Sequence, residues 1–434
     1  MGVKQGCPLS PTLFGLYVDR LEKHLLETAD IDAPTLRGVL VPLLLYADDL
    51  ILMSTSAAGL QKQLDALASF CDQRQLTVNI SKTKIVVFEP RRSAVADFVL
   101  NGAVVERVES YKYLGFVFHA TKNMSFGTSF LVAAAKKAMF AMRRRCAELG
   151  IRDPALQCKL FDTLVLPILS YAVEVWGVKP GIAEEAEVLH RSFLKSLLGI
   201  RKSTANEVML AEVGRLPLQI RFWRQILKYH HRTLGLNGTR LVTLAMLEGF
   251  AFSNQAVIAE GGSWPEWHEH VMLFLMNQQQ YVFGKFDIAA VVDKVKQDYF
   301  ERYNTSDSSS LTRYRGLQPD HKYAEYLSSV RCFSNRRLLS RFRCGCHGLH
   351  VDTGRWVGTG RKDRLCQVCH SDQDVEDEQH FLFHCPAYSD IRRKYAAMFQ
   401  QAFTAPDLIT QTEPNVLGGF LRECFSCRKA LLPI

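Results

Sequence analysis

The sequence predicts an α+β protein with three parts: a mixed N-terminal part of strands and helices, a helical middle, and a small C-terminal domain rich in Cys and His. Three observations support this prediction. The apolar stretch 39–53 is interrupted by a short polar turn, which is typical of a β-hairpin. Apolar residues recur at helical spacing from 126 to about 231. Paired Cys and His residues gather in 321–434, with the spacings of metal ligands.

The composition is that of an ordinary globular protein with a mild excess of positive charge. The chain has 434 residues, 47% of them hydrophobic and 22% charged, with a formal net charge of +9. This length allows roughly two to four domains, and the charge permits a nucleic-acid partner without requiring one. No apolar run reaches the ~20 residues of a membrane span, and no signal stretch is present. We therefore expect a nuclear or cytoplasmic protein without a membrane partner.

The N-terminal part is expected to combine helices with short strands. Ser10 can cap a helix that has Pro11 at its first position, where an N–H group would have no intrahelical acceptor. The apolar residues that follow at helical spacing are Phe14, Tyr17, Val18, Leu21 and Leu25. A second helix is predicted over 57–72, and its apolar face comprises Leu60, Leu64, Leu67 and Cys71. Short strands are predicted at Leu76–Ile80, Lys84–Phe88 and Tyr111–Phe118.

The predicted hairpin carries two adjacent carboxylates at its tip. From Leu43 to Met53 the sequence reads Leu-Leu-Leu-Tyr-Ala-Asp-Asp-Leu-Ile-Leu-Met, which places Asp48 and Asp49 in the turn. Phosphoryl transfer between nucleotides uses two divalent cations ~3.5–4 Å apart. Mg²⁺ prefers oxygen ligands and keeps several waters, so a few fixed carboxylates suffice. The alternative is an ordinary Asp-Asp turn, because Asp is common in turns.

Further motifs accompany this hairpin in a fixed order. A Gly-Val-Lys-Gln-Gly-Cys-Pro loop precedes it at 2–8, Asn-Ile-Ser-Lys-Thr follows at 79–83, and Tyr-Lys-Tyr-Leu-Gly at 111–115. Together with the Asp-Asp hairpin, these motifs resemble the palm of reverse transcriptases. The resemblance implies a partial palm, built as an antiparallel sheet with helices, followed by a helical thumb.

The resemblance also implies roles for individual residues. Asp48 and Asp49 would bind Mg²⁺, and Tyr46 would lie in the substrate site beside them. Gln5 and Gly6 would lie against the template near the nascent base pair, and Tyr113 and Gly115 would contact the primer end. Lys82, with Lys84 as the runner-up, would act as a general acid or as a positive charge beside the leaving pyrophosphate. A solvated lysine is the alternative for both.

The C-terminal part contains a spacing typical of a zinc site. Cys366 and Cys369 are two residues apart, and His380 and Cys385 follow. Two thiolates at this spacing and a second His/Cys pair can complete a tetrahedron around Zn²⁺. His384 is the alternative fourth ligand. The remaining groups Cys344/Cys346/His347 and Cys424/Cys427 are left open, with ordinary thiols favoured for the first.

Two further stretches, one in the helical middle and one in the C-terminal part, indicate which branch of the reverse-transcriptase family the sequence resembles. Residues 164–177, which read Leu-Val-Leu-Pro-Ile-Leu-Ser-Tyr-Ala-Val-Glu-Val-Trp-Gly, resemble the segment after the palm in non-LTR retrotransposons of the LINE class. The run from His380 to Pro386 resembles the C-terminal zinc motif of LINE proteins. A group II intron maturase shares the palm motif but not a zinc tail with this spacing.

Two basic stretches are compatible with nucleic acid. Lys136, Lys137, Arg143 and Arg144 fall within about 120° on a helical wheel, as a thumb helix along a duplex backbone requires, although a solvated face is the alternative. Residues 331–364 hold nine Lys and Arg against two Asp, with aromatic side chains among them. That bias favours phosphate contact with base stacking.

The expected organisation has four parts: a partial palm at 1–120, a thumb and connection at 121–235, a helical region of unclear role at 236–320 with a polar linker at 304–310, and a zinc tail at 321–434. The resemblance implies an RNA-directed DNA polymerase that uses Mg²⁺, Zn²⁺, an RNA template and a DNA primer, and no organic cofactor. The upstream Asp motif and the fingers of the family are not recognised in this sequence. We therefore expect this chain alone to be inactive; the alternative is a non-catalytic nucleic-acid-binding protein.

Overall fold

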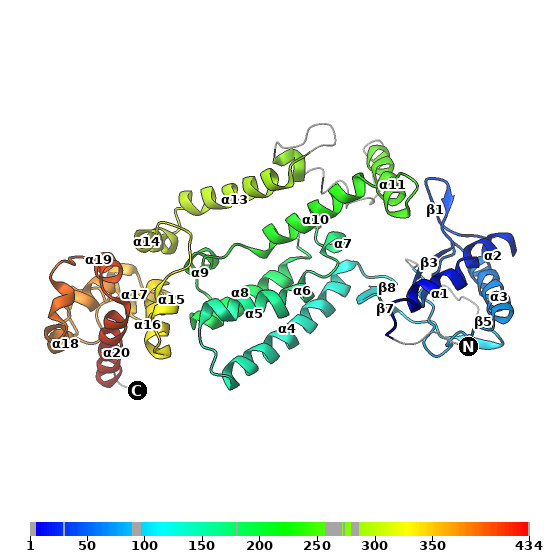
Figure 1. Ribbon diagram of the computed structural model, residues 1–434. Helices are drawn as coiled ribbons and strands as arrows, with labels where there is room; N and C mark the ends of the chain where they lie inside the picture. The colour runs from blue at the N-terminus through cyan, green and yellow to red at the C-terminus, as the bar shows by residue number, and fades with distance from the viewer. Residues whose placement is uncertain are drawn as a thin grey trace. The chain divides into compact units, whose positions relative to one another are not determined.

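The computed structural model describes residues 6–28, 31–88, 97–178, 181–256, 271, 274–278 and 286–432. The chain forms two compact units (Figure 1). The first comprises Met1–Phe130 and Leu227–Phe274, and the second comprises Leu131–Ile226 and Leu275–Ile434. None of the described helices is both long enough and apolar enough to span a membrane. The four-part division expected from the sequence stays a prediction.

The first unit combines helices with β-hairpins. Its described elements are α1 (Ser10–Val18), α2 (Leu21–Thr28), β1 (Thr35–Leu36), β2 (Val39–Leu40), β3 (Leu43–Tyr46), β4 (Asp49–Leu52), α3 (Ala57–Arg74), β5 (Phe98–Leu100), β6 (Ala103–Val105), β7 (Ser110–Tyr113), β8 (Phe116–His119) and α11 (Leu241–Ala256). Its strands pair as the antiparallel hairpins β1–β2, β3–β4, β5–β6 and β7–β8. Three of these turns have two residues with positive φ, Arg37-Gly38, Asn101-Gly102 and Leu114-Gly115, which is the backbone that best matches strand twist.

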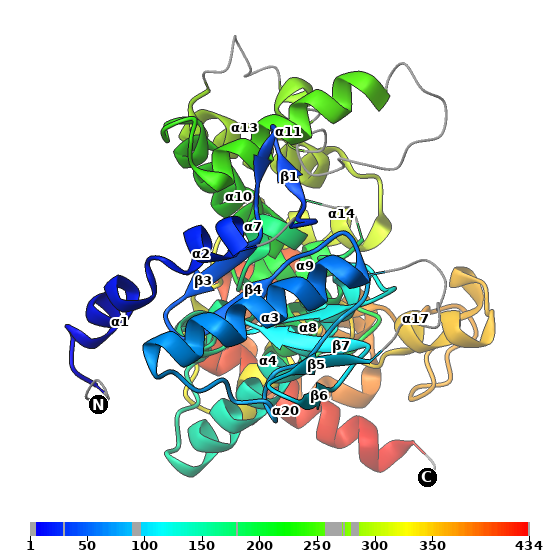
Figure 2. The same ribbon diagram turned by 90° about the vertical axis from the view of Figure 1, so that its right-hand side faces the viewer.

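Helix α3 organises the core of the first unit. It begins after Ser56, whose hydroxyl accepts a hydrogen bond from the Gly59 amide at 3.0 Å, as an N-cap requires. The buried side chains Leu67 and Cys71 pack with α2 and with partly buried Leu43 and Leu50 of the β3–β4 hairpin. Figure 2 shows α3 lying across these strands. The predicted apolar face of 57–72 is confirmed, and this contact anchors the stems of the hairpin.

Two of the predicted strands are wrong. Residues 76–80 form no strand, and 84–88 contribute only a single parallel bridge between Ile85 and Arg107. The cause is a turn between them: the Asn79 carbonyl accepts hydrogen bonds from the Lys82 and Thr83 amides, both at 3.1 Å. Backbone groups bonded within this turn cannot join a ladder of strands.

Two other predictions need smaller corrections. The expected strand Tyr111–Phe118 is a hairpin, because Leu114 and Gly115 turn the chain with φ of 44° and 88°. Helix α1 begins at Ser10, so Leu9 and not Ser10 occupies the cap position.

The second unit is helical, as predicted for 126–231. Its elements, including α4 and α10, which cross from one unit to the other, are α4 (Met124–Glu148), α5 (Pro154–Leu164), α6 (Leu166–Leu169), α7 (Val173–Trp176), α8 (Glu184–Leu198), α9 (Asn206–Glu212), α10 (Leu218–Leu234), α13 (Ile288–Thr305), α14 (Ser309–Leu317), α15 (Tyr326–Ser329), α16 (Phe333–Arg343), α17 (His350–Thr353), α18 (Ser389–Lys394), α19 (Ala405–Gln411) and α20 (Pro414–Leu431). Shorter helical turns are η1 (Gly354–Val357), η2 (Arg361–Asp363), η3 (His380–His384), η4 (Pro386–Tyr388) and η5 (Ala396–Phe399). The polar linker predicted at 304–310 is shorter than expected, because only 306–308 separate α13 from α14.

A buried carboxylate ties four of these helices together. Glu212, at the end of α9, is 0% exposed. Its oxygens accept hydrogen bonds from Arg343 Nε of α16 at 2.8 Å, from the Tyr326 hydroxyl of α15 at 2.6 Å and from the Tyr314 hydroxyl of α14. Arg343 also donates to Gln318 Oε1 at 2.6 Å. A buried charge is tolerated only when it is paired and hydrogen-bonded in this way.

Candidate functional site

The β3–β4 hairpin presents Asp48 and Asp49 to solvent, as predicted. Tyr46 pairs with Asp49 across the ladder, so Ala47 and Asp48 form the turn. Ala47 takes a left-handed conformation with φ of 54°, which lets the chain reverse in two residues. Both carboxylates are exposed. The arrangement leaves two adjacent carboxylates free to take up cations, with their backbone fixed by strands that pack on α3.

Tyr113, at the end of β7, lies close to this tip. Burial raises the pKa of its phenol, and the negative charge of Asp49 raises it further. The neighbouring turn holds Gly115 at φ 88°. The structure therefore brings together Asp49 and Tyr113, which the sequence places 64 residues apart. Tyr46, on the tip itself, is 65% exposed.

The two candidate lysines differ in their surroundings. Lys84 forms an ion pair with Glu106. Lys82 is exposed, and none of the described residues makes an ion pair with it. Its carbonyl accepts a hydrogen bond from the Tyr111 hydroxyl of β7 at 3.4 Å, which ties the Asn79–Thr83 turn to that strand. Lys82 is thus the lysine whose charge is available to a ligand.

The predicted template contacts are only partly described. Gln5 lies outside the described residues, and Gly6 has φ of 80° with open space around it. Within the described part of the chain, Asp48 and Asp49 are not joined by a third His, Cys, Asp or Glu in a close group; such a group occurs at Cys366, Cys369, His380 and Cys385.

This second group is the predicted metal centre. One ligand atom from each of Cys366, Cys369, His380 and Cys385 lies within 4.8 Å of all the others. The Cys366 and Cys385 sulfurs are 4.0 Å apart, and the Cys369 sulfur lies 3.4 Å from His380 Nε2. These separations are those of ligands at the corners of a tetrahedron around one ion. The alternative ligand His384 is exposed and is not part of the group.

The donor set fits a divalent cation that prefers sulfur and nitrogen. The hydrogen bond from Cys385 lowers the pKa of the Cys366 thiol to about 4, and the same contact raises the pKa of Cys385 above its usual range. The protein alone thus stabilises one thiolate here and opposes a second. A cation at the centre would stabilise the additional thiolates that the protein alone disfavours. Three thiolates and an imidazole are a common ligand set for Zn²⁺.

Surrounding residues position these ligands. His380 begins the π-helical turn η3, and its Nδ1 lies 3.9 Å from Asp374 Oδ2, on the side away from the thiols. The Cys366 amide donates to the Asp374 carbonyl at 2.9 Å, and Leu365 bridges to Val375. Buried Glu376 then accepts two hydrogen bonds from Arg428 of α20, at 2.7 and 2.8 Å. The loop that carries the ligands is therefore tied to α20.

The remaining Cys and His groups join no such cluster in the described chain. Burial raises the pKa of Cys344, Cys346 and Cys424, in the last case to about 12, as expected of inert thiols. His347 Nε2 lies 3.0 Å from Glu378 Oε1. The thiol interpretation favoured for Cys344 and Cys346 is consistent with these surroundings.

Many arginines of the basic stretch 331–364 have structural roles that the sequence did not reveal. Arg336 donates to the backbone carbonyls of Val330 and Arg152, and Arg341 donates to that of Gly199. Arg343 is the buried partner of Glu212. The stretch is therefore less of a phosphate-binding surface than its composition suggested. On α4, in contrast, Lys136, Lys137 and Arg144 are exposed and Arg143 is half-buried, so the predicted basic face is present.

Comparison with known proteins agrees with these features. Residues 1–118 match the family described as reverse transcriptase (RNA-dependent DNA polymerase). The chain is 30% identical over 223 residues to a retrovirus-related Pol polyprotein from the type-1 retrotransposable element R2 of Popillia japonica, covering 49% of this chain and 30% of that protein. It is 25% identical over 183 residues to the RNA-directed DNA polymerase from the mobile element jockey of Drosophila melanogaster, covering 41% and 19%. A Pol polyprotein from element R1 4 of Nasonia vitripennis is 21% identical over 345 residues, 76% of each chain.

The Asp-Asp hairpin and the family match define residues 1–118 as part of a reverse-transcriptase domain. The relatives then make the assignment more specific: the chain is related to the reverse transcriptases of LINE-type, non-LTR retrotransposons. It spans less than a third of the length of the first two relatives.

Proposed function

We propose that this chain is the palm, thumb and zinc tail of a LINE-type RNA-directed DNA polymerase. The observation that carries the proposal is the exposed Asp48-Asp49 tip on a hairpin fixed by α3, inside a segment that matches reverse transcriptases. In the complete protein these carboxylates would hold Mg²⁺. Bound Mg²⁺ would activate the primer hydroxyl and hold the triphosphate. The ligands of this chain would be an RNA template and a DNA primer.

The other residues of the site support the same chemistry. Lys82 has no ion-pair partner among the described residues, so its positive charge suits a leaving pyrophosphate. Tyr113 and the Leu114-Gly115 turn lie at the same end of the palm as Asp49, where the primer end would pass. Gly6 leaves space for close approach of a template base, and Gln5 and Tyr46 would contact the same duplex. Zn²⁺ at Cys366, Cys369, His380 and Cys385 would fold the tail.

We propose further that this chain by itself does not support synthesis. Two carboxylates from one hairpin are too few to hold two cations, and the described residues place no third acidic group with them. This favours a second candidate function, a nucleic-acid-binding protein without catalysis, for the chain acting alone. The basic face of α4 and the zinc tail would then carry the binding.

Primer extension tests both statements. The 434-residue chain with Mg²⁺, a primed RNA template and nucleotides should extend nothing above background. Supplied with a segment that carries a further palm carboxylate, it should extend the primer, and Asp48→Ala should abolish that gain. Asp72→Ala, which removes an exposed carboxylate from α3, is the matched control and should keep the activity. Extension by the chain alone that Asp48→Ala removes would contradict the proposed inactivity, and a gain that survives Asp48→Ala would contradict the catalytic role.

A further inference from the structure

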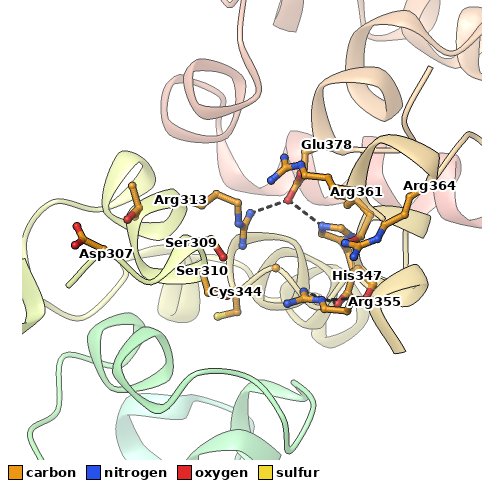
Figure 3. Close-up of a pocket in the computed structure, with 14 residues that line it drawn as sticks. Asp307, Ser309, Ser310, Arg313, Cys344, His347, Arg355, Arg361, Arg364 and Glu378 are labelled. Carbon is orange, nitrogen blue, oxygen red and sulfur yellow. Dashed lines mark hydrogen bonds and ion pairs between the residues drawn. The ribbon is translucent and has the colours of Figure 1, made fainter. Parts of the chain in front are cut away.

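A cavity of about 500 Å³ lies between the start of α14 and the chain that follows α16 (Figure 3). Ser309, Ser310 and Arg313 of α14 line one side. Arg355, Arg361 and Arg364 line the other. The whole cavity belongs to the second unit. It is separate from the Asp48-Asp49 tip and from the four metal-ligating side chains.

The charges around the cavity leave an excess of positive charge. Arg313 donates to Glu378 at 2.9 Å, and Arg355 donates to Asp352 at 2.9 Å. Asp352 is already paired with Arg201 at 2.6 Å. Within the described chain, neither Arg361 nor Arg364 has an acidic partner. Asp307 also lines the cavity, so four lining arginines (Arg313, Arg355, Arg361 and Arg364) face three lining carboxylates (Asp307, Asp352 and Glu378), which leaves one positive charge in excess.

Arg364 is held in a fixed position by backbone alone. Its Nε donates to the Thr359 carbonyl at 2.9 Å, and its Nη1 donates to the Val351 carbonyl at 2.8 Å. A Cβ atom on Gly354 would come within 2.8 Å of the Arg364 side chain, so glycine is what leaves room for it. These bonds leave Nη2 without an acceptor among the described residues. A guanidinium fixed in advance loses little entropy when it binds an anion.

The start of α14 adds neutral donors to the opposite wall. The first backbone N–H groups of an α-helix have no intrahelical acceptor, and no side chain caps this helix. Ser309 and Ser310 also bring hydroxyl groups. Amides and hydroxyls on one side and guanidinium groups on the other match the oxygens of a phosphate.

We infer that this cavity binds a phosphate group of a single-stranded nucleic acid. The strand is indicated by Trp356, which follows Arg355 and is 58% exposed. The Arg201 guanidinium lies 4.1 Å from the Trp356 ring centroid, so one face is supported while the ring stays open to solvent. An adjacent base can stack on such a ring. Identification of the ligand as a strand rests on the proposed function, whereas the anion site itself does not.

The test is binding of a short labelled single-stranded RNA by the full-length, zinc-loaded chain, measured by fluorescence anisotropy at two salt concentrations. Arg361→Ala removes a cavity charge that has no internal partner, and Ser310→Asp places a negative charge at the wall. Each should weaken binding roughly tenfold, as loss of one charge-assisted contact does, and should reduce the salt dependence. Arg393→Ala, which changes the net charge equally at an exposed site, is the control and should bind as the wild type does. Inorganic phosphate should compete with the RNA for the wild type more effectively than chloride at equal ionic strength.

Trp356→Ala distinguishes a strand from free phosphate. This variant should weaken RNA binding several-fold and leave competition by phosphate unchanged. If RNA affinity stayed the same and only the competition by phosphate were lost, the proposed stacking on Trp356 would be overturned. RNA binding by Arg361→Ala and Ser310→Asp equal to the wild type would overturn the inference while leaving the proposed function intact. Absence of RNA binding by the wild type would overturn both.

Discussion

At the scale of single residues, the buried Glu212 shows how one side chain can decide the stability of a unit. Its carboxylate is fully enclosed and accepts hydrogen bonds from Arg343, Tyr326 and Tyr314. The low dielectric around it strengthens each bond, and the loss of one partner leaves the others uncompensated. Burial alone would lower the pKa of Arg343, but the neighbouring Glu212 carboxylate raises it above its usual range, so the guanidinium keeps its charge.

We predict that Glu212→Gln destabilises the second unit by about 3 kcal/mol, because it leaves the Arg343 charge buried without a counter-ion. Urea denaturation followed by tyrosine and tryptophan fluorescence measures this. Glu185→Gln, an exposed residue of α8, is the control and should change stability little. Equal stability of the two variants would show that the network contributes nothing net.

Single residues also mark where sequence reasoning failed. The Asp48-Asp49 turn was predictable because apolar strands flank it. Three hairpin turns contain two residues with positive φ, and one of these pairs, Asn101-Gly102, is a signal that could have identified the missed β5–β6 hairpin. The turn at Asn79 was not foreseen, although Asn is a common turn residue: its Oδ1 accepts hydrogen bonds from the Lys82 amide at 3.2 Å and from the Ser81 hydroxyl at 2.8 Å.

At the scale of elements, the loop that carries the four candidate metal ligands is joined to its surroundings by aromatic packing. Phe381, one residue after the ligand His380, lies with its ring centroid 4.9 Å from both Tyr388 and Phe425. Phe425 belongs to α20, which packs against α16. The ligand spacing was readable from the sequence, because two thiols two residues apart are rare by chance. The choice of Cys385 over His384 as the fourth candidate ligand needed the coordinates, since the two residues are adjacent in the sequence.

We predict that Cys369→Ser removes zinc and unfolds 365–385 locally, because a small zinc site supplies much of its own folding free energy. Metal analysis should give one zinc per wild-type chain and none in the variant, with Zn–S distances of about 2.3 Å by X-ray absorption. Hydrogen exchange should rise in this loop and not in α3, which has its own apolar core.

Two variants serve as controls for the zinc prediction. Cys332→Ser changes an exposed thiol outside the group, and His384→Ala removes the alternative ligand; both should keep zinc. Zinc lost from His384→Ala but kept by Cys385→Ser would show that His384 is the fourth ligand and that the assignment of Cys385 is wrong.

At the scale of the whole molecule, stability should depend on pH through its buried imidazoles. Burial lowers the pKa of His230 from 6.5 to about 4. The folded chain therefore keeps this ring neutral at pH values where the unfolded chain binds a proton. The free energy of unfolding therefore does not depend on His230 above pH 6.5, and it decreases as the pH falls from 6.5 toward 4.

We predict that wild type loses up to about 3 kcal/mol more stability than His230→Leu between pH 7 and pH 4, the free-energy equivalent of this pKa shift. Both proteins have the same candidate zinc ligands. The acid sensitivity of those ligands therefore cancels in the difference between the two free energies of unfolding. Urea denaturation at several pH values measures it. Parallel curves for the two proteins would contradict the lowered pKa of His230.

The organisation of the whole chain could be predicted from the sequence only in part. Motif order was sufficient to recognise the palm, because each motif is short and local. The prediction of a phosphate-binding surface at 331–364 was correct only in part. Composition cannot distinguish an arginine that faces solvent from one that donates to a backbone carbonyl more than a hundred residues away in the sequence. Arg341, which donates to Gly199, is of that second kind.

These arginine contacts have a consequence for how such a chain can diverge. Arg336, Arg341 and Arg364 bind carbonyl oxygens of the main chain, which every amino acid presents in the same way. A mutation at Val330 or Val351 can therefore change the partner's side chain while the contact survives, whereas Gly199 is held by its φ of 68°. A carboxylate partner such as Glu212 has no such freedom. Among diverging relatives of this chain, the three arginines should persist while Val330 and Val351 vary, whereas Glu212 and Arg343 should be kept or lost together.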